Sequence, residues 1–375
     1  MKKVLTLLFA SAIAFTSIQA QEASESVQTE SKKEEKPAGF YKPQVFGVVK
    51  AKFEKSLDNS SYRFNVRSSR LGVKGNVAAN MSYLSQIELN AEGKLNIFDA
   101  VVTYSPFKFI DFKLGQQLTN FSTEVGRGPG SNYFANRSLL AKYITNYYYM
   151  DGDKYKMASL GPRDIGLNTI FKYNLLFPAK TYIGLFNGSG INNPEWSNSV
   201  NMNIRQEFGG NEGLKVSGSY YFGKCQNQYR TDMWDVEMRY KYKDLLLESE
   251  FAQHIFTSFQ KQRSSAWVIQ GSYNFMLPEN KLAKSVLPVF RYDLAKDMVY
   301  KADTGEKNEI IASNVYGVDN VQRVTAGVNF RMTNKPVQAE VRFQYEHYIM
   351  NNRPVDFKTS QLLHDKFTVE IVACF

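Results

Sequence analysis

The sequence predicts an all-β protein, a 16-stranded antiparallel transmembrane β-barrel, counting about 16 strand segments, with a long constriction loop between strands 5 and 6. Three observations lead to this prediction. The carboxyl-terminal segment alternates between apolar and polar side chains, and the chain holds 23 Tyr and 27 Phe. Segments with the same alternation recur along the chain, and the connections between them are alternately short and long.

The carboxyl-terminal segment, Phe367 to Phe375, places an apolar side chain at every odd position. Successive side chains of a strand point to opposite faces, so Ile371 and Phe375 share one apolar face while Glu370 lies on a polar one. A strand between lipid and water needs this pattern. Outer-membrane barrels also carry a terminal aromatic residue that their insertion machinery recognises. We therefore expect that machinery to be a partner that recognises Phe375.

The amino terminus predicts export. Residues 1–20 combine Lys2 and Lys3 with an apolar run and a small residue, Ala20, which is typical of a cleaved signal peptide. The apolar run of about a dozen residues is shorter than the roughly 20 of a spanning helix, so a membrane anchor is the weaker alternative. Residues 21–40 are polar and charged, which predicts a flexible periplasmic lead-in, or alternatively a short helix. The β-barrel is expected over residues 41–375.

Alternating segments bounded by turn residues predict the strands in order. In the first, Val45 and Val49 share one face and Lys50 lies on the other. The second segment changes phase along its length, which predicts a β-bulge near Ser68 and Ser69. The predicted strands span residues 44–54, 62–74, 80–91, 95–105, 109–119, 163–174, 179–187, 199–208, 213–223, 232–243, 245–255, 265–275, 286–296, 321–332, 336–348 and 365–375.

The connections alternate in length, as in bacterial barrels, whose periplasmic turns are short and whose extracellular loops are long. Short turns are expected at residues 105–108, 174–178, 209–212, 243–244 and 333–335, and long loops at residues 120–162, 297–320 and 349–364. With the amino terminus in the periplasm, an even number of strands returns Phe375 to that side. One long connection, Met276 to Ser285, falls on the periplasmic side.

The longest connection, residues 120–162, stands where general porins place the loop that folds into the lumen. A short helix is expected from Ser138 to Tyr143 within it. We predict a constriction loop, because a barrel of about 16 strands leaves an aqueous channel. A loop on the outer surface or against a neighbouring subunit is the alternative. The candidate constriction residues are Arg127, Arg137, Lys142, Tyr147, Tyr148 and Tyr149.

Following the alternation inward, basic side chains modestly exceed acidic ones, in keeping with the formal net charge of +10. Basic groups on a low-dielectric wall raise the local anion concentration, which predicts a mild preference for anions such as phosphate. Alternatively, the arginines pair with acids on adjacent strands and hold the barrel shape. Arg63, Arg67 and Arg70 form the first cluster to test. The predicted pore-lining basic residues are Arg63, Arg67, Arg70, Lys74, Lys113, Arg205, Arg239, Arg291, Arg323, Arg331 and Arg342.

The sequence argues against an enzyme. His254, His347 and His364 are the only histidines, and no spacing typical of a catalytic triad, a metal site or a nucleotide-binding loop occurs. We therefore expect no cofactor and no metal, and an exported barrel has no nucleic-acid partner. Cys225 and Cys374 are expected at opposite ends of the barrel, too far apart for a disulfide, and hence as free thiols.

Several short motifs together resemble the phosphate-selective porin family, also called porin O and P. They are RFNVRSSRLGVKG (residues 63–75), FDAVVTY (98–104), DFKLGQQLTNFSTE (111–124), RDIGL (163–167), GLFNGSGINN (184–193), VFRYD (289–293) and TAGVNFRM (325–332). The resemblance implies a homotrimeric channel in the bacterial outer membrane, with lipid and small anionic or polar solutes as partners. The family's phosphate-binding residues do not match positions of this chain.

Two other functions remain open at this stage. Aromatic residues stack on the apolar faces of sugars, so Tyr147 to Tyr149 suggest a sugar or oligosaccharide channel as the alternative to an anion channel. A barrel can also serve as the anchor of a surface protein with little channel activity. The sequence does not indicate the solute or the pore radius.

Overall fold

The computed structural model describes residues 40–89, 95–144, 146–151, 154–159, 163–225, 229–257, 262–280, 282–303, 308–313, 318–333, 337–351 and 363–375. The predicted signal peptide and nearly all of the predicted lead-in lie outside these ranges. Residues 41–375 form one structural unit, which is described below. In the described part of the chain, no helix has the length and apolarity needed to cross a membrane.

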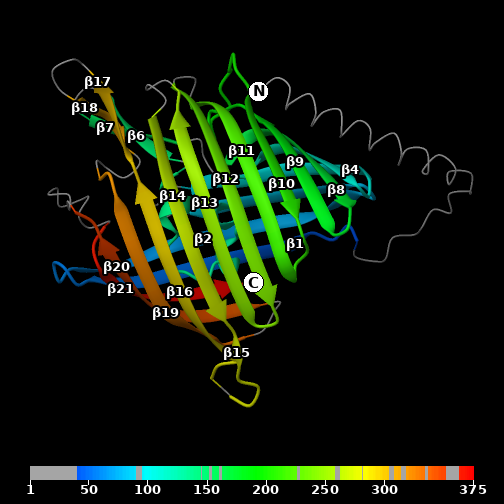
Figure 1. The fold of residues 1–375 in the computed structure, drawn as a ribbon. Helices are drawn as coiled ribbons and strands as arrows, with labels where there is room; N and C mark the ends of the chain where they lie inside the picture. Colours follow the sequence, from blue (N-terminus) through cyan, green and yellow to red (C-terminus); the bar gives the residue numbers. More distant parts are fainter. Residues whose placement is uncertain are drawn as a thin grey trace, which may run out of the picture. The chain divides into compact units, whose positions relative to one another are not determined.

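Sixteen antiparallel strands form a closed barrel (Figure 1). Each wall strand pairs with the next one along the chain, and β1 pairs with β21, from Val48↔Cys374 to Ser56↔Lys366, which closes the wall. The two-residue strand β15 (Phe275–Met276) follows β14 and pairs with the start of β16. The wall strands are β1 (Gln44–Ser56), β2 (Tyr62–Ala78), β3 (Met81–Leu89), β4 (Leu95–Phe107), β5 (Ile110–Leu118), β8 (Arg163–Asn174), β9 (Pro178–Phe186), β10 (Asn201–Phe208), β11 (Gly213–Cys225), β12 (Tyr229–Tyr242), β13 (Leu245–Phe256), β14 (Gln262–Tyr273), β16 (Ser285–Lys296), β19 (Val321–Arg331), β20 (Gln338–Ile349) and β21 (Lys366–Cys374).

Side chains alternate between the two faces of the wall, with apolar residues outside. In β21, Ile371 is 58% exposed and Phe375 just beyond it is 56% exposed, whereas Thr368 and Glu370 are fully buried inside. The prediction that the last strand turns its apolar side chains outward and its polar side chains inward is therefore confirmed. An apolar outer face is stable only against lipid, since exposing so much apolar surface to water is unfavourable.

The predicted strands agree with the wall, and β8 spans the predicted residues 163–174. The sequence missed four short strands in the long connections: β6 (Asn146–Asp151), β7 (Lys154–Ser159), β17 (Val299–Asp303) and β18 (Asn308–Ser313). They form a second sheet in which β18 pairs with β6 through Ala312↔Tyr149. Segments of five or six residues are too short for alternation to distinguish them from loops.

Two β-bulges interrupt neighbouring parts of the wall. Lys50 pairs with Ser68 but Ala51 with Val66, so Arg67 is an extra residue in β2, next to the bulge predicted at Ser68 and Ser69. In β4, Phe98 is likewise extra, between the pairs Gln86↔Asp99 and Ile87↔Ile97. An extra residue changes the alternation and redirects side chains, which matters for the lumen below.

Gly115 of β5 provides a test of this wall. Its φ of +128° is rarely adopted by other residues, and a Cβ there would collide with the carbonyl oxygen of Ala100. We expect Gly115→Ala to lower the free energy of unfolding by roughly 1–3 kcal/mol, measured by urea unfolding in detergent micelles.

Gly210→Ala is the control, because the nearest atom to its added Cβ lies 3.9 Å away. Equal losses from both substitutions would contradict the role assigned to Gly115.

Candidate functional site

The connection between β5 and β8 begins with a segment that lies against the inner face of the wall. This inner loop, residues 119–144, contains α2 (Thr123–Gly126), the 3₁₀ turn η1 (Pro129–Ser131) and α3 (Leu139–Tyr143). The Oγ atoms of Ser122 and Ser138 accept hydrogen bonds from the backbone of the two helices, as N-caps do. The helix predicted from Ser138 to Tyr143 is thus confirmed, and it contacts β14 and β16.

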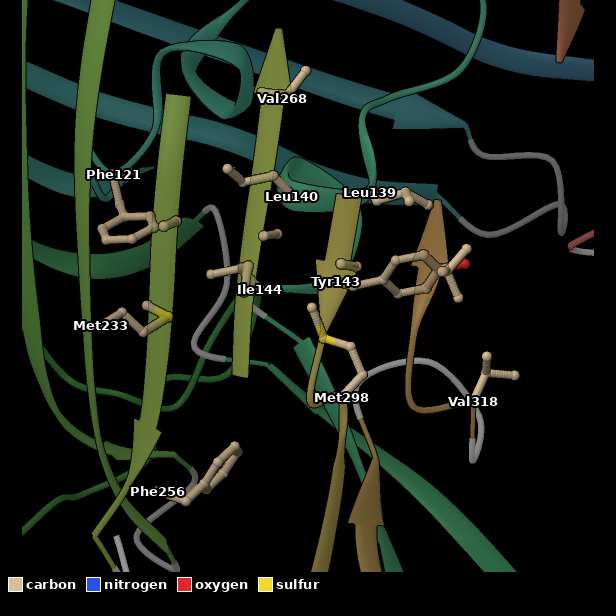
Figure 2. Packing of buried hydrophobic residues seen from close by; sticks show 14 of the residues in the cluster. Phe121, Leu139, Leu140, Tyr143, Ile144, Met233, Phe256, Val268, Met298 and Val318 are labelled. Atoms are coloured by element: carbon tan, nitrogen blue, oxygen red, sulfur yellow. The ribbon is translucent and has the colours of Figure 1, made fainter. Parts of the chain in front are cut away.

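Apolar contacts hold the second half of the inner loop in place. Figure 2 shows Leu139, Leu140 and Ile144 among buried side chains of the wall, such as Met233 and Val268. All five are almost fully buried. Inward-facing apolar residues would be unfavourable in an aqueous channel, so their presence on β12 and β14 is explained by the loop that covers them.

Buried ion pairs hold the first half. Arg291 of β16 lies 3.0 Å from the Glu124 carboxylate, which also accepts a hydrogen bond of 2.9 Å from the Ser138 backbone. Burial alone would raise the pKa of Glu124, but Arg291 and this hydrogen bond outweigh it and hold the pKa below its ordinary value. Arg323 donates to the carbonyl oxygen of Arg137 at 2.7 Å.

Carboxylates of β12 bind the start of α2. The backbone N–H groups of Ser122 and Thr123 donate to Asp235 at 2.9 Å and to Glu237 at 2.7 Å. Helix amino termini have N–H groups without partners inside the helix, and carboxylates satisfy them well. Arg205 of β10 donates to both oxygens of Glu237, at 2.9 and 2.8 Å. The carboxylates of Asp235, Glu237 and Glu250 lie within 4.8 Å of one another, so acidic groups outnumber Arg205 on this side of the lumen.

Four arginines predicted to line the pore need correction. Arg205, Arg291, Arg323 and Arg342 face the interior, but their side chains are at most 5% exposed. Each pairs with a carboxylate, and Arg291, Arg323 and Arg342 also donate to backbone carbonyls of the inner loop. They hold the loop and the wall together, which is the alternative that the sequence had left open.

A second set of arginines has a different environment. Arg67 and Arg70 of β2, Arg163 of β8 and Arg137 of the inner loop lie close enough for their charges to interact; we call them the arginine cluster. The pKa of Arg137 is lowered to about 10, mainly by burial; Glu124 opposes this shift, and the positive charges of the three wall arginines contribute to it. The cluster therefore places positive charges of the inner loop and of the wall near one another.

Ion pairing leaves the arginine cluster with excess positive charge. Arg70 lies 2.9 Å from Glu88, and Arg163 lies 3.0 Å from Asp99. Within the described ranges, neither Arg67 nor Arg137 forms an ion pair, and Glu124 acts on Arg137 from a longer distance. Lys50 and Lys52 of β1 are also close enough to Arg67 for their charges to repel it. The bulge at Arg67 explains the density of charge, because it allows residues 67, 68 and 70 to face the lumen.

The other predicted site residues have different neighbours. Arg63 lies at the start of β2, some distance along the strand from Arg70, and forms an ion pair with Glu54 at 2.6 Å. Tyr147 to Tyr149 lie on β6, and their side chains are outside what the structure describes. Lys74 lies over the Phe46 ring and Lys142 over the Tyr143 ring. Arg331 forms an ion pair with Glu340 and Arg127 one with Glu248, and Arg239 donates to the Asn211 carbonyl oxygen. Lys113 is half-buried.

The sequence missed two residues of this site. Alternation placed Asp164 on the lumen face and hence Arg163 outside, but both are buried at the start of β8. Phe98 was not among the predicted site residues. The neighbouring pair Ile97 and Phe98, which breaks the alternation, was the available signal for the bulge.

Both cysteines were predicted as free thiols. Cys374 is a free thiol. The side chain of Cys225 lies outside what the structure describes.

The closed barrel, the apolar outer face and the charged lumen support an outer-membrane channel. The predicted resemblance is confirmed: the family described as phosphate-selective porin O and P matches residues 45–164, a range that includes the whole arginine cluster. With the fold, this match places the protein in the bacterial outer membrane. No curated protein matches the chain.

Solved porin structures share the fold at low sequence identity. The chain is similar to Salmonella typhi OmpF in complex with daunomycin, with 13% identity, a TM-score of 0.56 and coverage of 91% of this chain and 99% of that one. It is also similar to an anion-selective porin from Comamonas acidovorans, with 11% identity, a TM-score of 0.53 and coverage of 88% of this chain and 98% of that one. For the trimer form of OmpT, an outer membrane protein of Vibrio cholerae, the identity is 13% and the TM-score is 0.52. The match covers 89% of this chain and 98% of that one.

Removing Glu124 tests how the inner loop is held. Glu124→Ala leaves Arg291 buried without its counter-charge, which typically costs about 3–5 kcal/mol. We expect amide hydrogen exchange across residues 132–144 to become faster by about 100-fold or more, measured in the folded barrel by mass spectrometry.

Glu212→Ala is the control, since Glu212 forms an exposed ion pair with Lys241. Unchanged exchange in Glu124→Ala would show that the apolar contacts alone hold the loop.

Proposed function

We propose that the protein is a passive diffusion channel for small hydrophilic solutes with a mild preference for anions, phosphate among them. The observation that carries this proposal is the arginine cluster, in which Arg67 and Arg137 form no ion pair among the described residues, although Glu124 attracts Arg137 from a longer distance. Its position supports a role in permeation, because a loop that occupies part of the lumen narrows the path past these residues. One similar structure, from Comamonas acidovorans, is described as anion-selective.

The proposed mechanism is electrostatic. Positive charge on a low-dielectric wall concentrates anions within a screening length of about 10 Å at 0.1 M salt. Guanidinium groups offer planar pairs of N–H donors that replace part of the hydration shell of an oxyanion. Because Glu88 and Asp99 neutralise Arg70 and Arg163, the excess charge is small. An anion is therefore attracted without being retained, which conduction requires.

Reversing the charge of the unpaired arginines tests the proposal. In planar bilayers under a KCl gradient, we expect Arg67→Glu and Arg137→Glu each to lower the chloride-to-potassium permeability ratio by about fivefold. A fivefold change in this ratio corresponds to about 1 kcal/mol in total, which is the interaction energy of two unit charges about 4 Å apart in water.

Lys241→Glu is the matched control, because Lys241 lies near the end of β12 and pairs with Glu212. The proposal fails if both arginine variants keep the wild-type reversal potential, or if the purified barrel conducts no ions. The second result would favour a barrel that serves as the anchor of a surface protein.

A channel rather than an enzyme is also part of this proposal. The His347 Nδ1 atom lies 2.5 Å from Asp365, close to the end of β20, and its side chain is 47% exposed. His254 is fully buried beside the Phe256 ring, at 4.1 Å between centroids. Both histidines have structural neighbours that account for their positions.

We further propose that the channel is a homotrimer, as the resemblance implies and as the trimer form of the similar OmpT supports. Closed cyclic assemblies are common among oligomers. Native mass spectrometry of the protein released from detergent should give three chains per particle, and a monomer would overturn this assignment. Recognition of Phe375 by the barrel-insertion machinery stays a prediction.

A further inference from the structure

Phe98 is an aromatic residue on the polar face of the wall. It is the extra residue of the β4 bulge, between Ile97, which is 51% exposed on the outside, and the buried Asp99. An apolar ring next to an aqueous lumen has a cost in free energy, so its position calls for a physical reason. The contacts of the ring supply one.

Two guanidinium groups of the arginine cluster lie over the Phe98 ring. The Cζ atom of Arg70 is 4.0 Å from the ring centroid, and that of Arg163 is 3.5 Å away. The electron-rich face of an aromatic ring attracts a cation at such distances. One ring thus contacts two like charges that come from β2 and β8, strands that are not neighbours in the wall.

Carboxylates fix the same two guanidinium groups from the side. Arg70 donates from Nε and Nη2 to Glu88, at 2.9 and 3.3 Å, and Arg163 donates from Nε and Nη2 to Asp99, at 3.0 and 3.2 Å. The Nη1 atom of each arginine takes no part in these pairs. The ring and the carboxylates together orient two positive groups that would otherwise repel each other.

We propose that Phe98 is a positioning residue of the arginine cluster, which holds Arg70 and Arg163 beside Arg137 and thereby sets the strength of the anion preference. This inference rests on the proposed function and deepens it. Phe98 touches the arginines rather than the solute, so its effect should depend on the aromatic face and not on apolar volume alone.

The test compares an aliphatic with an aromatic replacement. In bilayers under a KCl gradient, we expect Phe98→Leu to lower the chloride-to-potassium permeability ratio by at least about twofold, because it removes a cation–π contact of about 0.5–1 kcal/mol. Phe98→Tyr should keep the wild-type ratio. Phe46→Leu is the control, since Phe46 contacts Lys74 at 5.8 Å and none of the arginine cluster.

The outcomes separate this inference from the proposed function. A wild-type ratio in Phe98→Leu, combined with a lowered ratio in Arg137→Glu, overturns the role of Phe98 and leaves the anion channel intact. Wild-type ratios in Arg67→Glu and Arg137→Glu overturn the proposed function itself. Should Phe98→Leu not fold, Phe98→Met replaces it, because methionine adapts to irregular spaces, and a wild-type ratio there equally overturns the inference.

Discussion

The hydrogen bonding of the backbone inside lipid is the constraint on which this structure depends. Hydrocarbon offers no partners for N–H and C=O groups, so a sheet in the membrane must close on itself. The pairing of β1 with β21 achieves that closure. Closure also divides every strand between lipid and lumen, and the two-residue alternation of apolar and polar side chains follows from it.

The interior of this barrel is organised by charge. Arg291, Arg323 and Arg342 are fully buried, yet each faces a carboxylate and a backbone carbonyl of the inner loop. Charges of this kind are tolerated away from water only when they are paired and hydrogen-bonded. Apolar side chains around α3 complete the contact with β12, β14 and β16.

The arginine cluster is what remains after this pairing. Two bulges, at Arg67 of β2 and Phe98 of β4, redirect side chains into the lumen on either side of β3, and the inner loop brings Arg137 toward this part of the wall. Selectivity would then depend on the difference between basic and acidic groups at one place and not on the net charge of the chain. A small local excess is compatible with rapid passage of anions, whereas a large one would retain them.

The sequence by itself determined the barrel, the number of wall strands, the positions of the strands to within a few residues and the helix at Ser138, because lipid on one side of every strand imposes a periodic pattern. It did not distinguish Arg67, which has no acidic partner among the described residues, from Arg291, which is buried in an ion pair. Both are polar residues on inward-facing positions. Only the tertiary structure decided between them, since the partner of each arginine lies on another strand or on the inner loop, far away in the chain. The same holds for Arg163 and Phe98, whose directions depend on where a strand begins and where a bulge interrupts it.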